Sequence, residues 1–365
     1  MYDAEAIVIG GGHNGLICAA YLAKAGVTTI LVEARDSVGG CASTVADMGA
    51  RFNICACDHS LIRAMPLIDE LNLSSHGLDY LEPEATYVNA FHENSGSWVF
   101  YHDSNQTMDG LSITHPSEVA NYKRYLEDAI PVAKLVIEIA QSGASMTEFL
   151  QVASRKRMKG VSKLLRWSKA SAVDVFKDYF DDWHLYMPGI STGPTVWGAP
   201  PEAPGTGLAA TVYATRHLIA SGRPRRGSGS LPDAILKSYL SHGGQVRLKS
   251  VVEKLQIENN KVKAVQLQDG SVIEAPTVIA ACDPHTVLVN WIDEAPVSAK
   301  SLISRWQKEP APEGYESKLD GIVQNLPTYK FMSELTGKFD HTDLTQSTVI
   351  ISPSPEKLKE AHILK

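Results

Sequence analysis

Residues 4–40 read AEAIVIGGGHNGLICAAYLAKAGVTTILVEARDSVGG, and this stretch decides the fold. Ala6–Ile9 is apolar and rich in β-branched side chains, which is typical of a buried parallel strand. Gly10, Gly12 and Gly15 follow at the GxGxxG spacing. These glycines allow a tight turn, the close approach of a pyrophosphate and close packing of a helix. The stretch therefore predicts a βαβ unit with a dinucleotide at its helix N-terminus.

A second strand is expected over residues 28–32, and Gly26 stands where a glycine closes the preceding helix. The strand ends at Glu33, whose carboxylate can accept hydrogen bonds from a ribose 2′-hydroxyl and would repel a 2′-phosphate. NADP is therefore disfavoured at this site. A glycine-rich turn without a ligand is the alternative, but the order strand, glycines, helix, strand and acid favours the dinucleotide site.

The residues after this acid resemble the FAD-binding fold that amine oxidases and phytoene desaturases share. In that superfamily a glycine pair follows the acid, and Glu33, Arg35, Gly39 and Gly40 match position by position. Residues 11–16 (GGHNGL) are similar to the pyridine nucleotide-disulfide oxidoreductase domain-containing protein 2 family, a phytoene-dehydrogenase-like group. The resemblance implies that Glu33 binds the adenosine ribose of FAD and that Arg35 lies beside the same end. An NAD-dependent dehydrogenase is a further alternative, although it does not need the glycine pair.

A later segment matches the same superfamily, whose flavin domain is discontinuous in sequence. Ser230 is a plausible N-cap of a helix that Gly243 and Gly244 end. Short strands of a meander are then expected, separated by turn signals at Asn259-Asn260 and Asp269-Gly270. The first strand comprises residues 245–248 together with 251–257, and the next two comprise residues 262–267 and 271–274. A returning strand is expected at residues 278–281. The resemblance implies that a valine opening this meander contacts the adenine through its backbone, and Val252 fits that place.

The expected fold class is α/β, with a Rossmann-like FAD/NAD(P)-binding domain that carries a β-meander and a mixed α+β substrate domain. Residues 1–85 and 217–290 are assigned to the FAD-binding domain, and residues 86–216 and 291–365 to the substrate domain. The expected cofactor-binding residues are Gly10, Gly12, Asn14, Gly15, Glu33, Ala34, Arg35, Gly39, Gly40, Cys41 and Val252.

Composition excludes several classes of function. The net charge of −7 argues against nucleic acid as the main partner, and no apolar run is long enough to span a bilayer. The first strand begins close to Met1, which leaves no room for a signal peptide, so we expect a cytoplasmic protein. Five cysteines, an odd number, suggest reduced thiols. A homo-oligomer is compatible with the sequence, but no motif specifies one.

The cysteines raise two questions of chemistry. Cys41 follows the glycine pair as in flavin disulfide reductases, but the next cysteine, Cys55, is too distant for a redox disulfide. Cys55, Cys57 and His59 alternate and could form a metal cluster. No second ligand pair at zinc spacing accompanies them, so a buried strand edge near the flavin is favoured and no metal is expected.

The region between the flavin segments is predicted to be mainly helical. Residues 116–140 show a helical pattern that Pro131 should kink or split, and residues 193–207 form a loop rich in proline and glycine. A basic run interleaved with apolar residues could lie on an anionic membrane, or could be a solvated helix whose apolar stripe faces the core. Its basic residues are Arg155, Lys156, Arg157, Lys159, Lys163, Arg166 and Lys169.

The sequence predicts an FAD-dependent oxidoreductase whose flavin takes a hydride from a C–C or C–N bond of an apolar or amine substrate. His59, Tyr213 and His217 are candidate active-site members, each also compatible with a packed or surface position. Relatives are expected to continue beyond residue 365 with a second glycine-rich flavin segment, which motivates the alternative of a non-catalytic nucleotide-binding or regulatory protein on a flavoprotein scaffold. The sequence specifies neither the substrate nor the electron acceptor.

Overall fold

The computed structural model describes residues 2–47, 49–55, 59–93, 95–141, 147, 150–151, 154, 160–194, 199–293, 296–309 and 348–363. The chain divides into two units. The first unit is drawn from Met1–Ile62, Pro66–Leu81 and Gly222–Lys318, and the second from Arg63–Met65, Glu82–Ser221 and Leu319–Lys365. The assignment of these units to cofactor and substrate binding stays a prediction.

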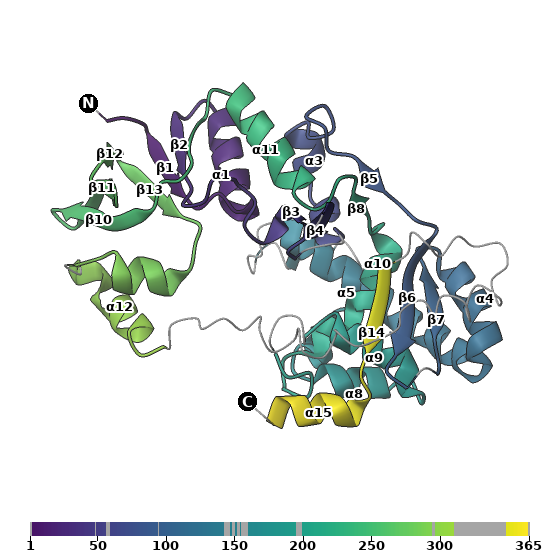
Figure 1. Cartoon of the computed structure of the whole chain (residues 1–365). Helices are drawn as coiled ribbons and strands as arrows, with labels where there is room; N and C mark the ends of the chain where they lie inside the picture. Colours follow the sequence, from purple (N-terminus) through teal and green to yellow (C-terminus); the bar gives the residue numbers. More distant parts are fainter. Residues whose placement is uncertain are drawn as a thin grey trace. The chain divides into compact units, whose positions relative to one another are not determined.

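The first unit contains a parallel sheet in the order β13-β1-β2-β9 (Figure 1). Every residue of β1 and β2 is buried, which explains their continuous apolar sequence. The connecting helix α1 buries a face of small residues, and Gly26, with φ of +85°, follows its end. The bounds are β1 (Ala6–Ile9), α1 (His13–Lys24), β2 (Thr29–Val32), β9 (Gln245–Arg247) and β13 (Thr277–Ala280).

The helix α11 (Ser230–Ser241) packs against α1 and shows two differences from the sequence-based expectation. Ser230 does not cap it: Gly229 is the N-cap residue, and the Ser230 hydroxyl donates to the Arg225 carbonyl at 2.8 Å. The strand β9 joins the parallel sheet beside β2 rather than the meander. Tyr239 explains this, because its hydroxyl lies 2.8 Å from the carbonyl oxygens of both Thr29 and Gln245 and so ties α11 to both strands.

The expected meander forms an antiparallel sheet in the order β10-β11-β12. Its strands are β10 (Val252–Glu258), β11 (Lys261–Leu267) and β12 (Val272–Glu274). Asn259 and Asn260 have φ of +52° and +61°, the backbone that a two-residue hairpin turn requires. Trp291 and Ile292 pack against the apolar core that the meander shares with β1 and β2. The first unit therefore extends past residue 290, where the sequence analysis placed a boundary.

The remaining elements of the first unit are short. A 3₁₀ turn begins at the second glycine of the pair and leads into the hairpin β3–β4. The bounds are η1 (Gly40–Ala42), β3 (Thr44–Asp47), β4 (Ala50–Asn53), α3 (Leu67–Glu70), β5 (Tyr80–Leu81), β8 (Arg223–Pro224), the π-helix η4 (Thr286–Asn290), η5 (Val297–Ala299) and α12 (Lys300–Trp306), while α2 (Leu61–Ala64) crosses the division between the units.

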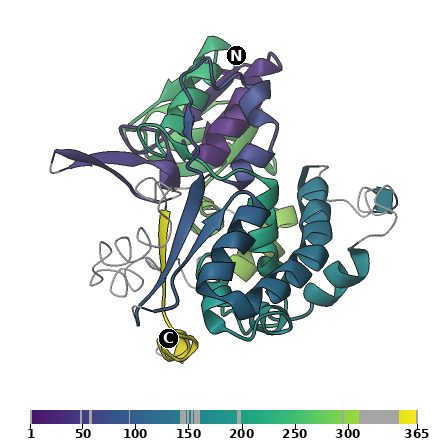
Figure 2. The same ribbon diagram turned by 90° about the vertical axis from the view of Figure 1, so that its right-hand side faces the viewer.

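The second unit packs helices against a three-stranded sheet in the order β14-β6-β7. Figures 1 and 2 show the yellow β14 beside the blue β6, a parallel pair drawn from distant parts of the sequence. The bounds are β6 (Ala85–Phe91), β7 (Trp98–Tyr101), α4 (Ser104–Thr114), η2 (Pro116–Glu118), α5 (Val119–Gln141), α7 (Val161–Trp167), α8 (Ala172–Lys177), α9 (Trp183–Ser191), η3 (Gly207–Thr211), α10 (Val212–Leu218), β14 (Thr348–Ser352) and α15 (Pro355–Ile363).

Two helices of this unit bear on predictions from sequence. α5 runs through Pro131 as one helix, so the proline does not split it. α7 covers part of the basic run, and its residues Val161, Leu164 and Trp167 lie in the core of the unit, as the alternative to membrane contact requires. Residues 155–159 of the run lie outside the described residues. No helix in the described part of the chain is long and apolar enough to cross a membrane.

Candidate functional site

The glycine-rich loop between β1 and α1 is built from backbone contacts that only glycine permits. Gly10 has φ of +104°, and its N–H donates to the Val32 carbonyl oxygen at 2.8 Å. A Cβ placed on Gly15 would lie 1.9 Å from the Gly10 carbonyl oxygen. Glycine at both positions therefore allows the tight turn and the close packing of α1 that the motif predicts.

The carboxylate of Glu33 holds the loop from the end of β2. Its Oε2 accepts a hydrogen bond from the Gly11 N–H at 2.6 Å, and its Oε1 accepts one from the Arg35 N–H at 2.9 Å. Glu33 is buried, and a Cβ on Gly11 would lie 2.9 Å from Oε2. Each carboxylate oxygen keeps a second lone pair, so Glu33 can still accept hydrogen bonds from a ligand hydroxyl.

The glycine pair lies against the glycine loop. The Gly39 N–H donates to the Gly11 carbonyl oxygen at 2.8 Å, and Gly12 and Gly39 form a parallel bridge. Gly39 and Gly40 have φ of +132° and +57°, and a Cβ on Gly40 would lie 3.0 Å from the Cα of Gly12. The two glycine segments that the sequence singled out therefore form one backbone surface at the carboxyl end of β1.

Arg35 and Ser43 close the other side of the glycine pair. The Arg35 guanidinium donates from Nη2 to the Gly40 carbonyl oxygen and the Ser43 Oγ, each at 3.3 Å. Ser43 Oγ donates in turn to the Gly40 carbonyl oxygen at 2.8 Å. Ser43 was not predicted as a site residue. Its place three residues after Gly40 was the signal in the sequence, because hydroxyl side chains commonly bond to nearby backbone.

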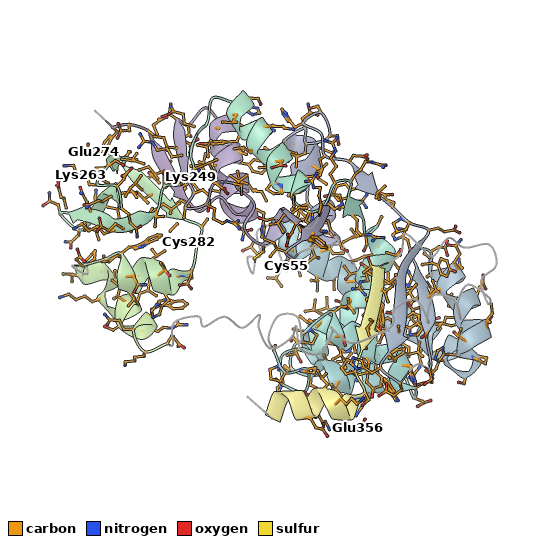
Figure 3. The ribbon with its side chains drawn as sticks, in the orientation of Figure 1. Cys55, Lys249, Lys263, Glu274, Cys282 and Glu356 are labelled. Carbon is orange, nitrogen blue, oxygen red and sulfur yellow. The ribbon has the colours of Figure 1, made fainter. Side chains whose placement is uncertain are left out.

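The residues just before the meander reach the same place through the backbone. The Ser250 N–H donates to the Glu33 carbonyl oxygen at 2.9 Å, and the Lys249 N–H donates to the Arg35 carbonyl oxygen at 2.8 Å (Lys249 is labelled in Figure 3). Val252 opens β10 two residues later, and its side chain is buried in the core. The structure thus brings the chain before β10 beside the acid, while the contact of Val252 with an adenine stays a prediction.

Four more residues lie around the glycine loop: three that the sequence predicted as cofactor-binding residues and one that it did not. Asn14, Ala34 and Cys41 are exposed, and in the chain they adjoin Gly15, Glu33 and Gly40. Cys282 lies beside Gly10, since a Cβ on that glycine would be 3.8 Å from the Cys282 Cβ (Figure 3). Burial, and then the charges of Asp283 and Glu33, raise the pKa of the Cys282 thiol. Its position just past β13, which pairs with β1, could have revealed it, because ligands bind at the carboxyl ends of such strands.

The loop has the donors that a pyrophosphate requires. Gly12 is the N-cap residue of α1, and no side chain caps this helix end. Among the described residues, the buried Nδ1 of His13 also has no hydrogen-bond partner. The first-turn N–H groups of α1 and its dipole can therefore interact with a phosphate, and the residues present fit a dinucleotide.

The three candidate active-site side chains are packed. The Tyr213 hydroxyl accepts from the Gly189 N–H and donates to the Leu185 carbonyl oxygen, each at 2.8 Å. His217 lies between the Tyr122 hydroxyl and the His102 carbonyl oxygen, each at 2.8 Å, and burial lowers its pKa to about 4. The third, His59, is buried, with Nδ1 3.0 Å from the Tyr80 hydroxyl.

The cysteine prediction is tested only in part. Cys18, Cys41, Cys55 and Cys282 are free thiols, and Cys55 is exposed just beyond the end of β4. Cys57 lies outside the described residues, so the choice between a metal cluster and a strand edge stays open at that position.

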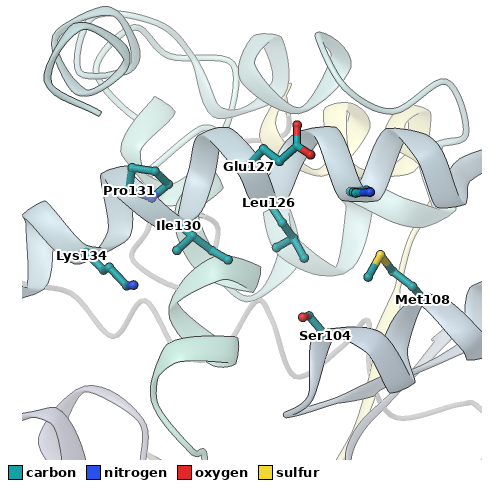
Figure 4. A pocket seen from close by; sticks show the side chains of 8 residues that line it. Ser104, Met108, Leu126, Glu127, Ile130, Pro131 and Lys134 are labelled. Carbon is teal, nitrogen blue, oxygen red and sulfur yellow. The ribbon is translucent and has the colours of Figure 1, made fainter. Parts of the chain in front are cut away.

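A pocket of about 530 Å³ lies in the second unit between α4 and α5 (Figure 4). It is lined by Ser104 and Met108 of α4 and by residues of α5 that include Leu126, Ile130 and Lys134. None of the site residues predicted from sequence lines this pocket, so it does not enlarge the site at the glycine loop.

The fold and the loop define a dinucleotide-binding protein of the flavoprotein type, and comparisons with known proteins identify the family. Residues 15–317 match the family described as flavin containing amine oxidoreductase, and the chain belongs to it. The resemblance to phytoene-dehydrogenase-like and amine-oxidase-like proteins is confirmed.

Individual relatives are distant. The chain is 25% identical to pyridine nucleotide-disulfide oxidoreductase domain-containing protein 2 of Rattus norvegicus, an alignment that covers 90% of this chain and 61% of the relative. It is 24% identical to a limonene dehydrogenase polypeptide of Castellaniella defragrans, over 82% of this chain and 56% of the relative. The chain thus spans about three-fifths of the length of these curated relatives.

Solved structures support the fold. An oxidoreductase from Methanosarcina mazei superposes with a TM-score of 0.56 at 16% identity, over 83% of this chain and 65% of that one. Wild-type putrescine oxidase bound to putrescine superposes with a TM-score of 0.54 at 20% identity, over 78% of this chain and 59% of that one. At these identities the likeness shows the fold alone, and it confirms the expected α/β class.

Proposed function

We propose that the first unit binds FAD, with the pyrophosphate at the N-terminus of α1 and the adenosine ribose on Glu33. The observation that carries the proposal is the Glu33 carboxylate, buried and bonded to the backbone N–H groups of Gly11 and Arg35. A fixed carboxylate there accepts from ribose hydroxyls and repels a 2′-phosphate. The flavin family gives the ligand class, and the absence of side chains at Gly12, Gly39 and Gly40 lets the two glycine segments lie close together beside this carboxylate.

In the whole protein we propose an FAD-dependent oxidoreductase acting on a C–C or C–N bond of an apolar or amine substrate. Bound FAD supplies a hydride acceptor. The family description, flavin containing amine oxidoreductase, supports this range, as do the names of two sequence relatives, limonene dehydrogenase and phytoene desaturase. Within this chain, the proposed contribution is to bind the ADP half of the cofactor and fix its orientation.

A second candidate function is a nucleotide-binding protein without catalysis. The observation that favours it is the packing of His59, Tyr213 and His217, whose polar atoms bond within the protein. Anaerobic addition of a candidate terpene or amine to the FAD-loaded protein distinguishes the oxidoreductase from the non-catalytic binding protein. Loss of the oxidised flavin absorbance supports the enzyme, whereas persistent colour with every such compound supports the binding protein.

Binding of FAD, ADP and NADH to the purified chain tests the cofactor proposal. FAD should bind with the absorbance bands of a flavoprotein, ADP should compete with it, and NADH should compete poorly. Glu33→Gln should weaken FAD binding by about 10- to 100-fold, because a glutamine places an NH₂ group against one of the two backbone donors.

Asp36→Asn is the matched control, since Asp36 is an exposed carboxylate three residues from Glu33. It should leave FAD affinity unchanged. A chain that takes up no FAD, or equal affinities of the wild type and Glu33→Gln, would contradict the proposal.

A further inference from the structure

Two histidines and an aspartate meet in the second unit, away from the residues that the proposed function uses. His115 lies at the junction of α4 and η2. Asp182 is the N-cap residue of α9, and His184 lies in the first turn of the same helix. Two elements more than sixty residues apart in sequence therefore contribute to one cluster of nitrogen and oxygen atoms.

The polar atoms of these side chains converge. His115 Nε2 lies 3.9 Å from Asp182 Oδ2, and His184 Nδ1 lies 2.6 Å from Asp182 Oδ1. One nitrogen or oxygen atom from each residue lies within 4.8 Å of the other two. His115 is 7% exposed, and the His184 side chain is 16% exposed. The cluster is thus shielded from solvent but open on the side of Asp182, whose side chain is 35% exposed.

We propose that His115, Asp182 and His184 bind a divalent transition-metal ion, with Zn²⁺ as the best match. Imidazole nitrogens favour such ions over Mg²⁺ and Ca²⁺, which prefer oxygen ligands. In a tetrahedral zinc site, ligand atoms lie about 3.3 Å apart, because each Zn–N or Zn–O bond is about 2.0 Å long. The separations of 2.6 and 3.9 Å, each to a different oxygen of Asp182, lie on either side of that value, and a rotation of the carboxylate can bring both closer to it.

Surrounding contacts hold the ligands in place. His115 Nδ1 lies 3.0 Å from the Thr114 hydroxyl, a contact that orients the imidazole ring. The His184 ring stacks on Trp183, with centroids 3.8 Å apart, and a Cβ on Gly96 would lie 2.3 Å from its Cδ2. The Asp182 N–H donates to the Glu118 carboxylate at 3.1 Å, which ties the start of α9 to η2.

Burial settles which His184 nitrogen faces the ion. Among the described residues, His184 Nε2 is buried without a hydrogen-bond partner and lies toward Gly96, whereas Nδ1 points to Asp182. The proposed ligands are therefore His115 Nε2, the Asp182 carboxylate and His184 Nδ1, with a water at the fourth position. The metal would link the end of α4 to the start of α9, a role independent of cofactor binding in the first unit.

Metal binding to the chelator-treated full chain tests the proposal. Zn²⁺ should bind at one equivalent per chain and raise the melting temperature by about 5 °C at a hundredfold excess over its Kd, whereas Mg²⁺ should have no effect. Co²⁺ should give the visible absorption bands of a site with nitrogen ligands. Asp182→Asn should lower Zn²⁺ affinity at least about tenfold while it keeps the helix cap, because asparagine caps as well as aspartate.

Asp181→Asn is the matched control, because Asp181 is the adjacent carboxylate and is exposed outside the cluster. It should keep the affinity of the wild type, and His115→Gln should lose it. Absence of stoichiometric Zn²⁺ binding overturns the proposal. So does binding that survives both Asp182→Asn and His115→Gln, since the ion would then lie elsewhere, for example on the free thiols.

Discussion

The glycine loop of the first unit and the aromatic core of the second are built by opposite means. In the loop, backbone groups make the contacts: the N–H groups of Gly10, Gly11 and Gly39 each have a defined acceptor. In the core, side chains make them, as in the Tyr122–His217 pair. A glycine motif dictates a backbone path directly, whereas aromatic packing leaves no local pattern in the sequence. Backbone-built sites can therefore be recognised from sequence, while side-chain sites require the fold.

Replacement of Gly15 should show the largest effect, because the backbone contact there leaves no space for a side chain. A Cβ there would lie 1.9 Å from the Gly10 carbonyl oxygen, so α1 must move away from β1. We expect Gly15→Ala to abolish FAD binding and to lower the free energy of unfolding by about 3 kcal/mol. Urea denaturation and FAD titration measure the two effects.

Gly26→Ala is the control for this variant. Gly26 has a positive φ, but a Cβ added there would meet no atom within 4 Å, so only backbone strain of about 1 kcal/mol is expected. Of the two glycines, only Gly26 has a positive φ, so similar losses for both variants would mean that the close contact at Gly15 costs no more than backbone strain at Gly26, which would contradict the prediction.

The same contrast explains what the sequence could predict. The strands, α1, the glycine pair and the acid Glu33 follow from local rules, because apolar runs and glycine spacing specify backbone paths. Ser43 and Cys282 were missed because their positions depend on how η1 and β13 pack around the loop. β9 was misplaced because a long-range contact, the Tyr239 hydroxyl with Thr29 and Gln245, selects its sheet.

Sites built from side chains were less predictable for a related reason. His59, Tyr213 and His217 were singled out by residue type, and no sequence rule distinguishes a catalytic histidine or tyrosine from a packed one. His115, Asp182 and His184 were missed as a group because the fold of α4 and α9 brings them together. Their spacing in sequence matches no metal-binding motif.

The pH dependence of stability should show the next largest effect, through His217. Burial lowers its pKa in the folded protein to about 4, from an ordinary value of 6.5. The unfolded chain then binds a proton between pH 6.5 and 4 that the folded chain does not. The stabilisation is complete above pH 6.5 and is lost as the pH falls toward 4, by about 3 kcal/mol in total.

Urea denaturation at a series of pH values measures this loss. His217→Gln should flatten the slope between pH 6.5 and 4, while His76→Gln, in the first unit, should keep the slope of the wild type. If His217→Gln kept the pH dependence of the wild type, His217 would not be a buried neutral side chain between the Tyr122 hydroxyl and the His102 carbonyl oxygen, as the aromatic core requires.

The smallest effect is expected at the exposed side of α7, where the membrane prediction can be tested. Leu164 is 9% exposed and packs in the core, whereas Leu165 is 52% exposed. Lys163 and Arg166 pair with Asp128 and Asp178, so the cations of this helix already have acidic partners. We therefore expect Leu165→Ser to change stability by less than about 0.5 kcal/mol.

Vesicles that contain phosphatidylserine decide between the two interpretations of the basic run. Because α7 buries its apolar face within its own unit, the chain should remain in the supernatant when these vesicles are sedimented. Leu164→Ala, which opens the core, is the control for the packed face and should lower stability measurably without changing sedimentation. The opposite outcome is wild-type protein that pellets with the vesicles and is released by high salt or by the Leu165→Ser substitution. That outcome would mean that the exposed face of α7 binds the membrane, because neither change would affect a helix that only packs in the core.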